Sequence, residues 1–273
     1  MPTFEIVDRK GLKAEAKTLL RGAEVNVRAF TALYLGIVLL LNLADLLANG
    51  GAAPTLDNVL GLFVSILTTL IGQVLSVGFI LYCMTIRLGQ RAEFLTLFDG
   101  FSLVGRVLVL FFVEAMFILL WSMLFVIPGI IAAYRYRFAY YNLCENPALG
   151  ALDALNLSKR QTRGYKSQLL MLDLSYLGWT ILSGLPSGIF TGMATYNAYL
   201  TLFETGVAGA VAQTPMWLLL VSALWTVGVS LFYLPTYQCT ELSYYETAKR
   251  TSGVTPNFPT LPTDGEPGDG GQF

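Results

Sequence analysis

Long stretches without charge constrain this chain more than any other feature of its sequence. Residues 58–86, 115–134, 174–203 and 205–240 contain no Asp, Glu, Lys or Arg. A bilayer core about 30 Å thick requires a helix of about 20 apolar residues, whereas soluble cores rarely contain several such runs. The chain is also 55% hydrophobic and only 13% charged, against roughly 25% charged residues in an average globular domain. We therefore expect an all-α, polytopic membrane protein.

The apolar segments predict six transmembrane helices. These cover residues 30–48, 59–83, 105–127, 129–145, 166–187 and 215–238. Basic residues gather before the first span and around the connections that follow the second, fourth and sixth, whereas the connections 49–58 and 188–214 contain none. Because basic connections stay in the cytoplasm, this distribution predicts three helical hairpins with the N- and C-termini cytoplasmic.

Pro128 and Gly129 decide between six spans and five. A five-span chain would use 105–134 as one long helix, and its odd number of spans would leave one basic connection outside. We interpret the Pro-Gly pair as a hinge at which the chain turns back. The fourth span is then about 17 residues long, at the short end of the usual range.

Segments outside the spans complete the predicted organisation. From Leu12 to Val27 the apolar residues recur at three- and four-residue steps while basic residues line another face, which is typical of a helix on a cytoplasmic membrane surface that contains anionic lipid headgroups. For the later helix, Asn146 is the expected N-cap and Gly164 the stop. The predicted domains are a cytoplasmic amphipathic helix at 1–29, a six-span membrane domain at 30–250 and a disordered cytoplasmic tail at 251–273. The membrane domain contains a cytoplasmic amphipathic helix at 147–163 and an external insertion at 188–214.

The residue types present argue against catalysis. The sequence contains no histidine, which removes the commonest general base and the commonest zinc ligand. Its three cysteines, Cys83, Cys144 and Cys239, have neither CxxC spacing nor an even count. Nucleophile-elbow, HExxH and Walker motifs do not occur. We expect no enzyme activity, no cofactor and no metal site, and the net charge of −1 gives no electrostatic reason to expect a nucleic acid partner.

Ionisable residues inside the predicted spans are the candidate site. With a helical rise of about 1.5 Å per residue, Glu114, Arg137 and Asp173 fall at nearly one depth from the cytoplasmic side. A charge in hydrocarbon costs about 2.5–3.5 kcal/mol on insertion scales, so such residues normally face inward and pair. Arg135 lies level with Trp121 across the Pro-Gly turn and is expected to stack on its ring.

Two interpretations of these residues remain open. Glu114, Arg135, Arg137 and Asp173 either line a polar cavity that binds an anion or a headgroup, or form a buried network that fixes helix registry, with a contribution from snorkelling to the interface. Seven tyrosines gather in the cytoplasmic halves of the fourth and sixth spans and are interpreted as an aromatic belt, with a tyrosine-lined groove for a lipid or peptide as the alternative. They are Tyr134, Tyr136, Tyr140, Tyr141, Tyr237, Tyr244 and Tyr245.

Several motifs resemble one family of bacterial membrane proteins. They are the run "LLWSMLFVIPGIIAAYRYRFAYYNLCENP" at 119–147, "LSYLGW" at 174–179, and Pro235 with Tyr237 before "YYET" at 244–247. Together they resemble the family called domain of unknown function 975, over roughly residues 10–250. The resemblance implies a multi-pass protein of the bacterial cytoplasmic (inner) membrane, and it implies no activity.

Two functional hypotheses follow. The first is a non-enzymatic membrane protein that binds or translocates a small or amphiphilic ligand through an intramembrane polar cavity. The alternative is a membrane scaffold or accessory subunit without ligand transport. In both, the partner is the lipid bilayer, with anionic lipid headgroups or other membrane proteins as further candidates. A water-filled cavity at the candidate residues would favour the first hypothesis, and a dry, fully paired cluster would favour the second.

Overall fold

All secondary structure of the described residues is helical. The computed structural model describes residues 8–22, 26–50, 56–205 and 215–254, and in these ranges it contains no strand. The elements are α1 (Arg9–Gly22), α2 (Val27–Asn49), α3 (Val59–Arg87), the 3-10 helix η1 (Phe94–Leu103), α4 (Val104–Leu124), α5 (Val126–Tyr136), α6 (Ala139–Glu145), α7 (Ala151–Gln161), α8 (Lys166–Thr205) and α9 (Met216–Ser252). The predicted all-α class is confirmed, while most of the predicted tail at 251–273 lies outside the described residues.

Five helices within these ranges are long and apolar enough to cross a membrane. They are α2, α3, η1 with α4, α8 and α9. Many of their large apolar side chains are exposed, among them Phe63, Phe112 and Trp217. Exposed apolar surface spread over several long helices is what a bilayer environment accommodates.

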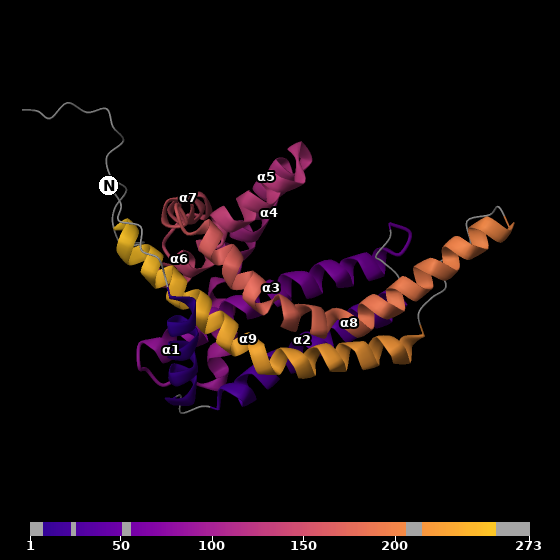
Figure 1. Cartoon of the computed structure of the whole chain (residues 1–273), viewed down its shortest axis with the longest axis horizontal. Helices are drawn as coiled ribbons and strands as arrows, with labels where there is room; N and C mark the ends of the chain where they lie inside the picture. The colour runs from indigo at the N-terminus through magenta and orange to yellow at the C-terminus, as the bar shows by residue number, and fades with distance from the viewer. Residues whose placement is uncertain (1–7, 23–25, 51–55, 206–214, 255–273) are drawn as a thin grey trace, which may run out of the picture.

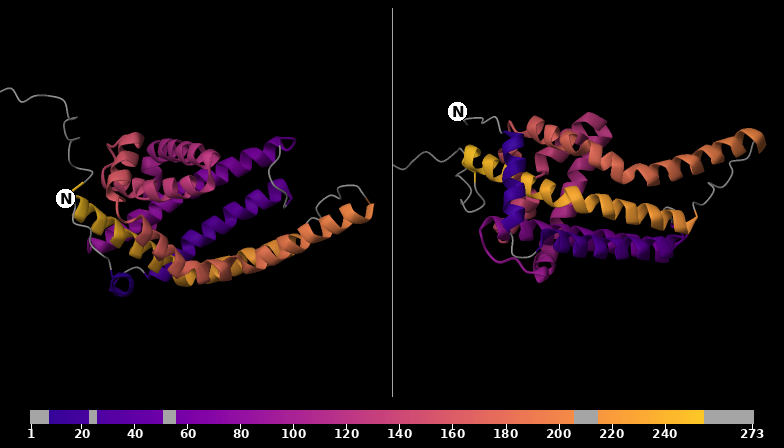
Figure 2. Two further views of the ribbon diagram at one scale, coloured as in Figure 1. Left: turned by 45° about the horizontal axis from the view of Figure 1, so that its top comes forward. Right: turned by 60° about the horizontal axis from the view of Figure 1, so that its bottom comes forward.

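Three pairs of consecutive helices pack as hairpins. They are α2 with α3, α4 with α5, and α8 with α9. Figure 1 shows α2–α3 and α8–α9 extending in a similar direction, while α4–α5 leaves the body in another. The short helices α1, α6 and α7 lie at the end where the hairpins meet, and the two views in Figure 2 agree on this arrangement.

The chain turns back between α4 and α5, slightly earlier than the sequence predicts. The turning residue is Phe125, whose backbone is extended (φ −161°, ψ 154°), and Pro128 lies in the first turn of α5, where its missing N–H costs no helical hydrogen bond. Gly129 is required by the close approach of the two helices, because a Cβ there would lie 2.1 Å from the Ser122 Oγ. A single helix over 105–134 therefore does not form.

The sequence predicts one helix over 129–145, and this prediction is wrong. The segment is divided into α5 and α6, which meet at Arg137 and Phe138. The Ser158 Oγ on α7 accepts a hydrogen bond from the Phe138 N–H (3.0 Å) and donates one to the Arg135 carbonyl (2.9 Å). This hydroxyl stabilises the break by satisfying backbone groups that a continuous helix would pair internally.

Two other helix boundaries differ from the prediction. The helix α7 begins after Gly150, while the Asn146 Oδ1 accepts the Ala148 N–H in the preceding turn. The helix α8 runs through Pro186 and past residue 188 as far as Thr205, so the first part of the predicted insertion continues this helix. Figure 2 shows α8 bending along its length, as expected where a proline removes a helical donor.

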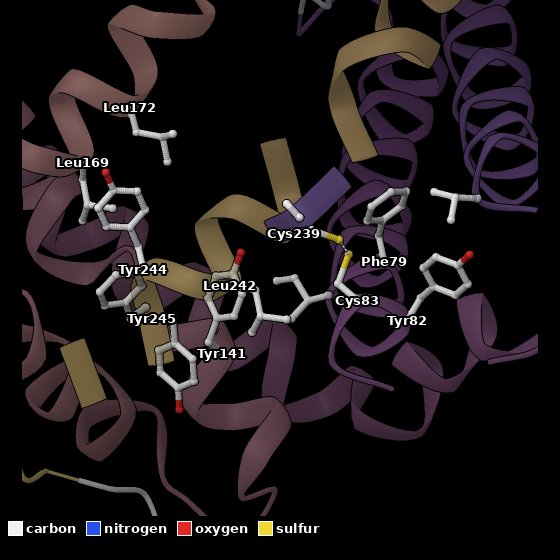
Figure 3. Packing of buried hydrophobic residues seen from close by; sticks show 14 of the residues in the cluster. Phe79, Tyr82, Cys83, Tyr141, Leu169, Leu172, Cys239, Leu242, Tyr244 and Tyr245 are labelled. Atoms are coloured by element: carbon white, nitrogen blue, oxygen red, sulfur yellow. Dashed lines mark hydrogen bonds between the residues drawn. The ribbon is translucent and has the colours of Figure 1, made fainter. Parts of the chain in front are cut away.

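The largest core joins α1, α2, α3, α6, α8 and α9 and is rich in aromatic residues. Figure 3 shows part of it, with Tyr141, Tyr244 and Tyr245 on one side and Tyr82 beside Phe79 on the other. Tyr244 is fully buried, and Tyr141 is only 3% exposed. Tyr141, Tyr244 and Tyr245 pack inside the protein, so the interpretation as an aromatic belt is wrong for these three.

Candidate functional site

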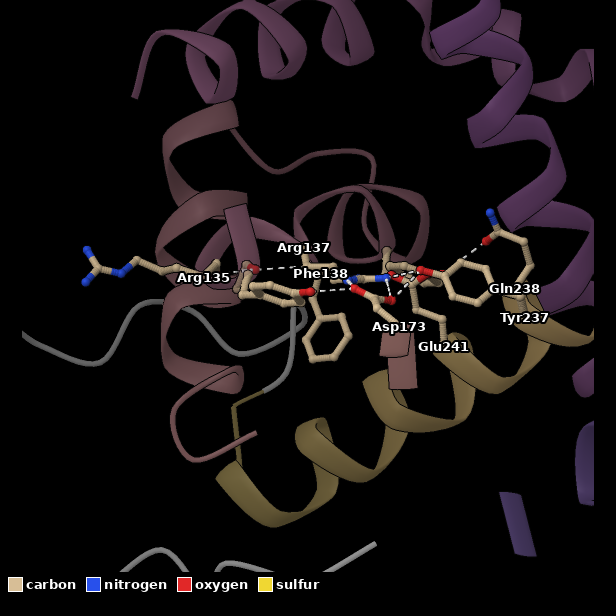
Figure 4. Close-up of polar contacts among 10 residues, drawn as sticks. Arg135, Arg137, Phe138, Asp173, Tyr237, Gln238 and Glu241 are labelled. Atoms are coloured by element: carbon tan, nitrogen blue, oxygen red, sulfur yellow. Dashed lines mark hydrogen bonds and ion pairs between the residues drawn. The ribbon is translucent and has the colours of Figure 1, made fainter. Parts of the chain in front are cut away.

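Arg137 lies at the centre of a polar cluster, at the break between α5 and α6 (Figure 4). Its Nη1 donates to the Asp173 Oδ2 (2.6 Å) and its Nη2 to the Asp173 Oδ1 (2.9 Å), which makes a bidentate pair with α8. Its Nε donates to the Glu241 Oε1 on α9 (2.7 Å). One guanidinium thus connects three parts of the fold.

Two tyrosine hydroxyls complete this cluster. Tyr134 donates to the Asp173 Oδ2 (2.7 Å) and Tyr237 donates to the Asp173 Oδ1 (2.9 Å), while the Tyr237 oxygen also accepts from the Arg137 Nη2. Both rings lie near the guanidinium, at 5.4 Å and 5.9 Å from its carbon. We refer to Tyr134, Arg137, Asp173, Tyr237 and Glu241 as the Arg137 network.

The local sequence places each member of the network. Tyr237 and Glu241 are four residues apart on α9 and therefore share one face of that helix. The Arg137 side chain leaves the chain where α5 ends. The Arg135 carbonyl at that end accepts hydrogen bonds from the hydroxyls of Ser158 on α7 and of Thr162 directly after it. The break between α5 and α6 thus sets the position of the guanidinium.

The charges in the network are paired internally and sum to −1. The side chains of Arg137, Asp173 and Glu241 are 17%, 30% and 9% exposed. Nε, Nη1 and Nη2 of the guanidinium all donate hydrogen bonds within the network. An anionic ligand would have to displace a carboxylate that already makes a charge-assisted bidentate contact. The arrangement suits a structural ion-pair network better than an anion site.

The structure brings together two of the four predicted site residues. Arg137 and Asp173 are paired as predicted, and the expected contact of Arg135 with Trp121 is confirmed, at 5.8 Å from the guanidinium carbon to the ring. Glu114 was expected to join Arg137 but contacts the hydroxyl of Tyr140. An equal depth in the membrane does not fix which face of a helix a residue occupies.

Sequence reasoning missed Glu241 and the hydroxyls of Tyr134 and Tyr237. Glu241 was overlooked because the sixth span was ended at residue 238, whereas α9 continues to Ser252. Its four-residue spacing from Tyr237 is the signal that could have identified it. The tyrosine hydroxyls could not be assigned because an interfacial and a buried tyrosine follow the same sequence pattern.

Neither of two cavities in the structure is lined by the Arg137 network. One, of about 250 Å³, lies between α2 and α3, and its lining includes Asn42, Asp45, Ser65 and Thr69. The other, of about 580 Å³, lies between α1, the start of α2, and α9. Within the described ranges, no group of three or more His, Cys, Asp and Glu side chains could hold a metal ion.

These features indicate a helical membrane protein whose central arginine is paired with carboxylates of its own chain. Residues 123–252 match the model of a family described as "Protein of unknown function (DUF975)". The match runs from the end of α4 to the end of α9, and over these residues it supports the resemblance to that family that the sequence indicates. No curated protein and no solved structure matches the chain. The family description names no activity.

Proposed function

We propose that the protein is a non-enzymatic membrane scaffold or accessory subunit with six spans and cytoplasmic termini in the bacterial inner membrane. Contacts at one end of the helices support this topology. Arg87, at the end of α3, lies 3.3 Å from Glu15 on α1 and also pairs with Glu246 on α9. The basic ends that should stay in the cytoplasm therefore lie together, and α5 with α6 returns the chain to that side.

One observation carries the choice of a scaffold: the side chains of the Arg137 network use the hydrogen-bond donors of the guanidinium, so none of its nitrogens is left for a ligand alone. Sites that move anions need cationic groups that exchange partners, whereas here the guanidinium binds two carboxylates and a tyrosine. Such a network holds α5, α6, α8 and α9 in register and leaves the apolar helix faces available for lipid or other proteins. A rigid intramembrane body with exposed apolar helices is suited to assembly with a partner.

The second candidate function is binding or translocation of a small or amphiphilic ligand. It is favoured by the polar cavity between α2 and α3, in which the Asp45 carboxylate accepts hydrogen bonds from the Ser65 hydroxyl and the Asn49 amide (3.0 Å). Translocation from this cavity past the Arg137 network to the cytoplasmic end would require water to reach the network, whereas a scaffold requires no water there. Water accessibility therefore separates the two functions.

Accessibility is measured in membranes with a small, charged thiol reagent and a variant without native cysteines. Glu241→Cys reports on the network, Thr69→Cys on the polar cavity, and Leu56→Cys on the exposed connection between α2 and α3. A scaffold leaves Glu241→Cys unlabelled from both sides and Leu56→Cys labelled. Labelling of Glu241→Cys would mean a water-filled path, and would favour translocation over the scaffold.

The scaffold itself is tested by photo-crosslinking in intact cells. A photoreactive residue at Met116 or Leu120 on the exposed face of α4 should give protein adducts of one discrete mass. The same residue at the buried Leu110 is the matched control and should give none. If Met116 and Leu120 yield only lipid adducts, this exposed face of α4 contacts lipid alone and the scaffold proposal is wrong for it.

A further inference from the structure

The larger cavity lies where the surface helix α1 meets α2 and α9 and is lined by charged and apolar residues on different sides. Its cationic side chains are Lys17 and Arg21 from α1 and Arg28 from the first turn of α2. On α9 its wall includes Phe232 and Pro235. Its volume is about 580 Å³, and none of its described lining residues is acidic. The site therefore combines net positive charge with an apolar wall.

Its cations are not neutralised by the described part of the chain. Lys17, Arg21 and Arg28 form no ion pair there, whereas Arg87 and Arg137 are each paired with two carboxylates. Lys17 and Arg21 are four residues apart and share one face of α1. The N-terminus of α2 adds the partial positive charge of its helix dipole at the same place. An anion in this cavity would meet positive charge that no described carboxylate compensates.

Positive charge also accumulates in the first half of α1. Lys13 donates to the Ser175 hydroxyl (2.7 Å) and lies 4.1 Å from the Tyr176 ring. Burial lowers the pKa of Lys13, and the neighbouring charges of Arg9 and Lys17 lower it further. Lys13 therefore lies among like charges on α1, and an anion beside Lys17 would relieve part of the repulsion between them.

The apolar wall is suited to a hydrocarbon chain. Phe232 is 66% exposed, and Leu231 lies beside it in the same wall. Pro235 has no N–H, so the Leu231 carbonyl one turn earlier lacks its usual helical donor. That carbonyl leaves one backbone acceptor in the apolar wall, which a hydroxyl group of a bound molecule can satisfy.

We propose that this cavity binds an anionic phospholipid, with the headgroup phosphate between Lys17, Arg21 and Arg28 and an acyl chain along Phe232. The shared chemistry is that of a phosphate anion, and the apolar wall favours a lipid as its source over free phosphate. The site is independent of the Arg137 network and goes beyond the proposed scaffold function. It ties the surface helix α1 to the membrane domain through a bound lipid.

The test measures lipids retained by the full-length, detergent-purified protein in native mass spectrometry. Phosphatidylglycerol and phosphatidylcholine are added in turn. The first variant is Lys17→Gln/Arg21→Gln/Arg28→Gln. The matched control, Lys159→Gln/Arg160→Gln/Arg163→Gln, removes the same charge on and after α7. Because three basic contacts to an anionic lipid are lost, we expect retention of phosphatidylglycerol to fall by about tenfold or more in the first variant, and to be unchanged in the control.

Further arms identify the source of the phosphate. Phe232→Ala should weaken retention of phosphatidylglycerol without changing the weak competition by glycerol 3-phosphate and inorganic phosphate. If these soluble anions compete as well as the lipid does, the cavity is a free-anion site. If the triple variant is not recovered folded, Arg21→Gln alone, at an exposed position on α1, takes its place. Equal loss in the cavity and control variants, or no loss in either, overturns the proposal.

Discussion

Replacing Arg137 with methionine should destabilise the protein strongly, because two carboxylates depend on one guanidinium. Glu241 is 9% exposed, so water can compensate little for the lost partner, whereas Asp173 at 30% remains partly hydrated. Loss of one partner from a buried ion pair costs about 3–5 kcal/mol, and the hydration of Asp173 places the expected value near about 3 kcal/mol. At roughly 2 °C per kcal/mol for a large chain, the Tm should fall by about 6 °C.

The assay is thermal unfolding in detergent, followed by tryptophan fluorescence. Arg135→Met is the matched control, because this guanidinium lies over Trp121 and has no acidic partner in the described ranges. Losing an exposed cation–π contact costs below about 1 kcal/mol. Arg137→Lys should recover only part of the stability, since an ammonium lacks the planar fork that binds both Asp173 oxygens.

Removing the charges together distinguishes pairing from other effects of the substitution. The triple variant Arg137→Met/Asp173→Leu/Glu241→Gln leaves no uncompensated charge in the network, so it should unfold at a higher temperature than Arg137→Met alone. If Arg137→Met unfolds like the unchanged protein, or if the separate effects simply add, the guanidinium is solvated at the headgroup level. The network would then not hold the helices in register.

Other substitutions test the packing around the network. A Cβ at Gly78 would lie 1.9 Å from a backbone carbonyl of η1, so Gly78→Ala should displace η1 and lower the Tm by several degrees. A Cβ at Gly72 on the same helix would meet nothing within 4 Å, so Gly72→Ala should leave the Tm unchanged. Ser158→Ala leaves the Phe138 N–H buried without its acceptor, which lowers the free energy of unfolding by about 1–3 kcal/mol. Its control is Ser187→Ala on an exposed face of α8, which should change the free energy of unfolding little. Equal Tm values within either pair would contradict the contacts described.

The sequence predicts the long apolar helices, the turn between α4 and α5 and the pairing of Arg137 with Asp173, because hydrophobic length and the cost of a buried charge are local properties. It does not predict the break at Phe138, which depends on a hydroxyl from α7, twenty residues later. Glu114 shows a second limit, since its depth follows from counting residues but its direction depends on how α4 is rotated against its neighbours. Tertiary contacts decide both.

The arrangement of the spans is tested most directly by cysteine labelling of intact cells with a membrane-impermeant reagent. Leu56→Cys, Phe125→Cys and Met216→Cys lie at the far ends of the three hairpins and should all be labelled. The native Cys83, Cys144 and Cys239, two of them buried, should not react. Labelling of Leu56→Cys without labelling of Met216→Cys would contradict six spans, and protection of Phe125→Cys would show that the α4–α5 hairpin does not reach the outer surface.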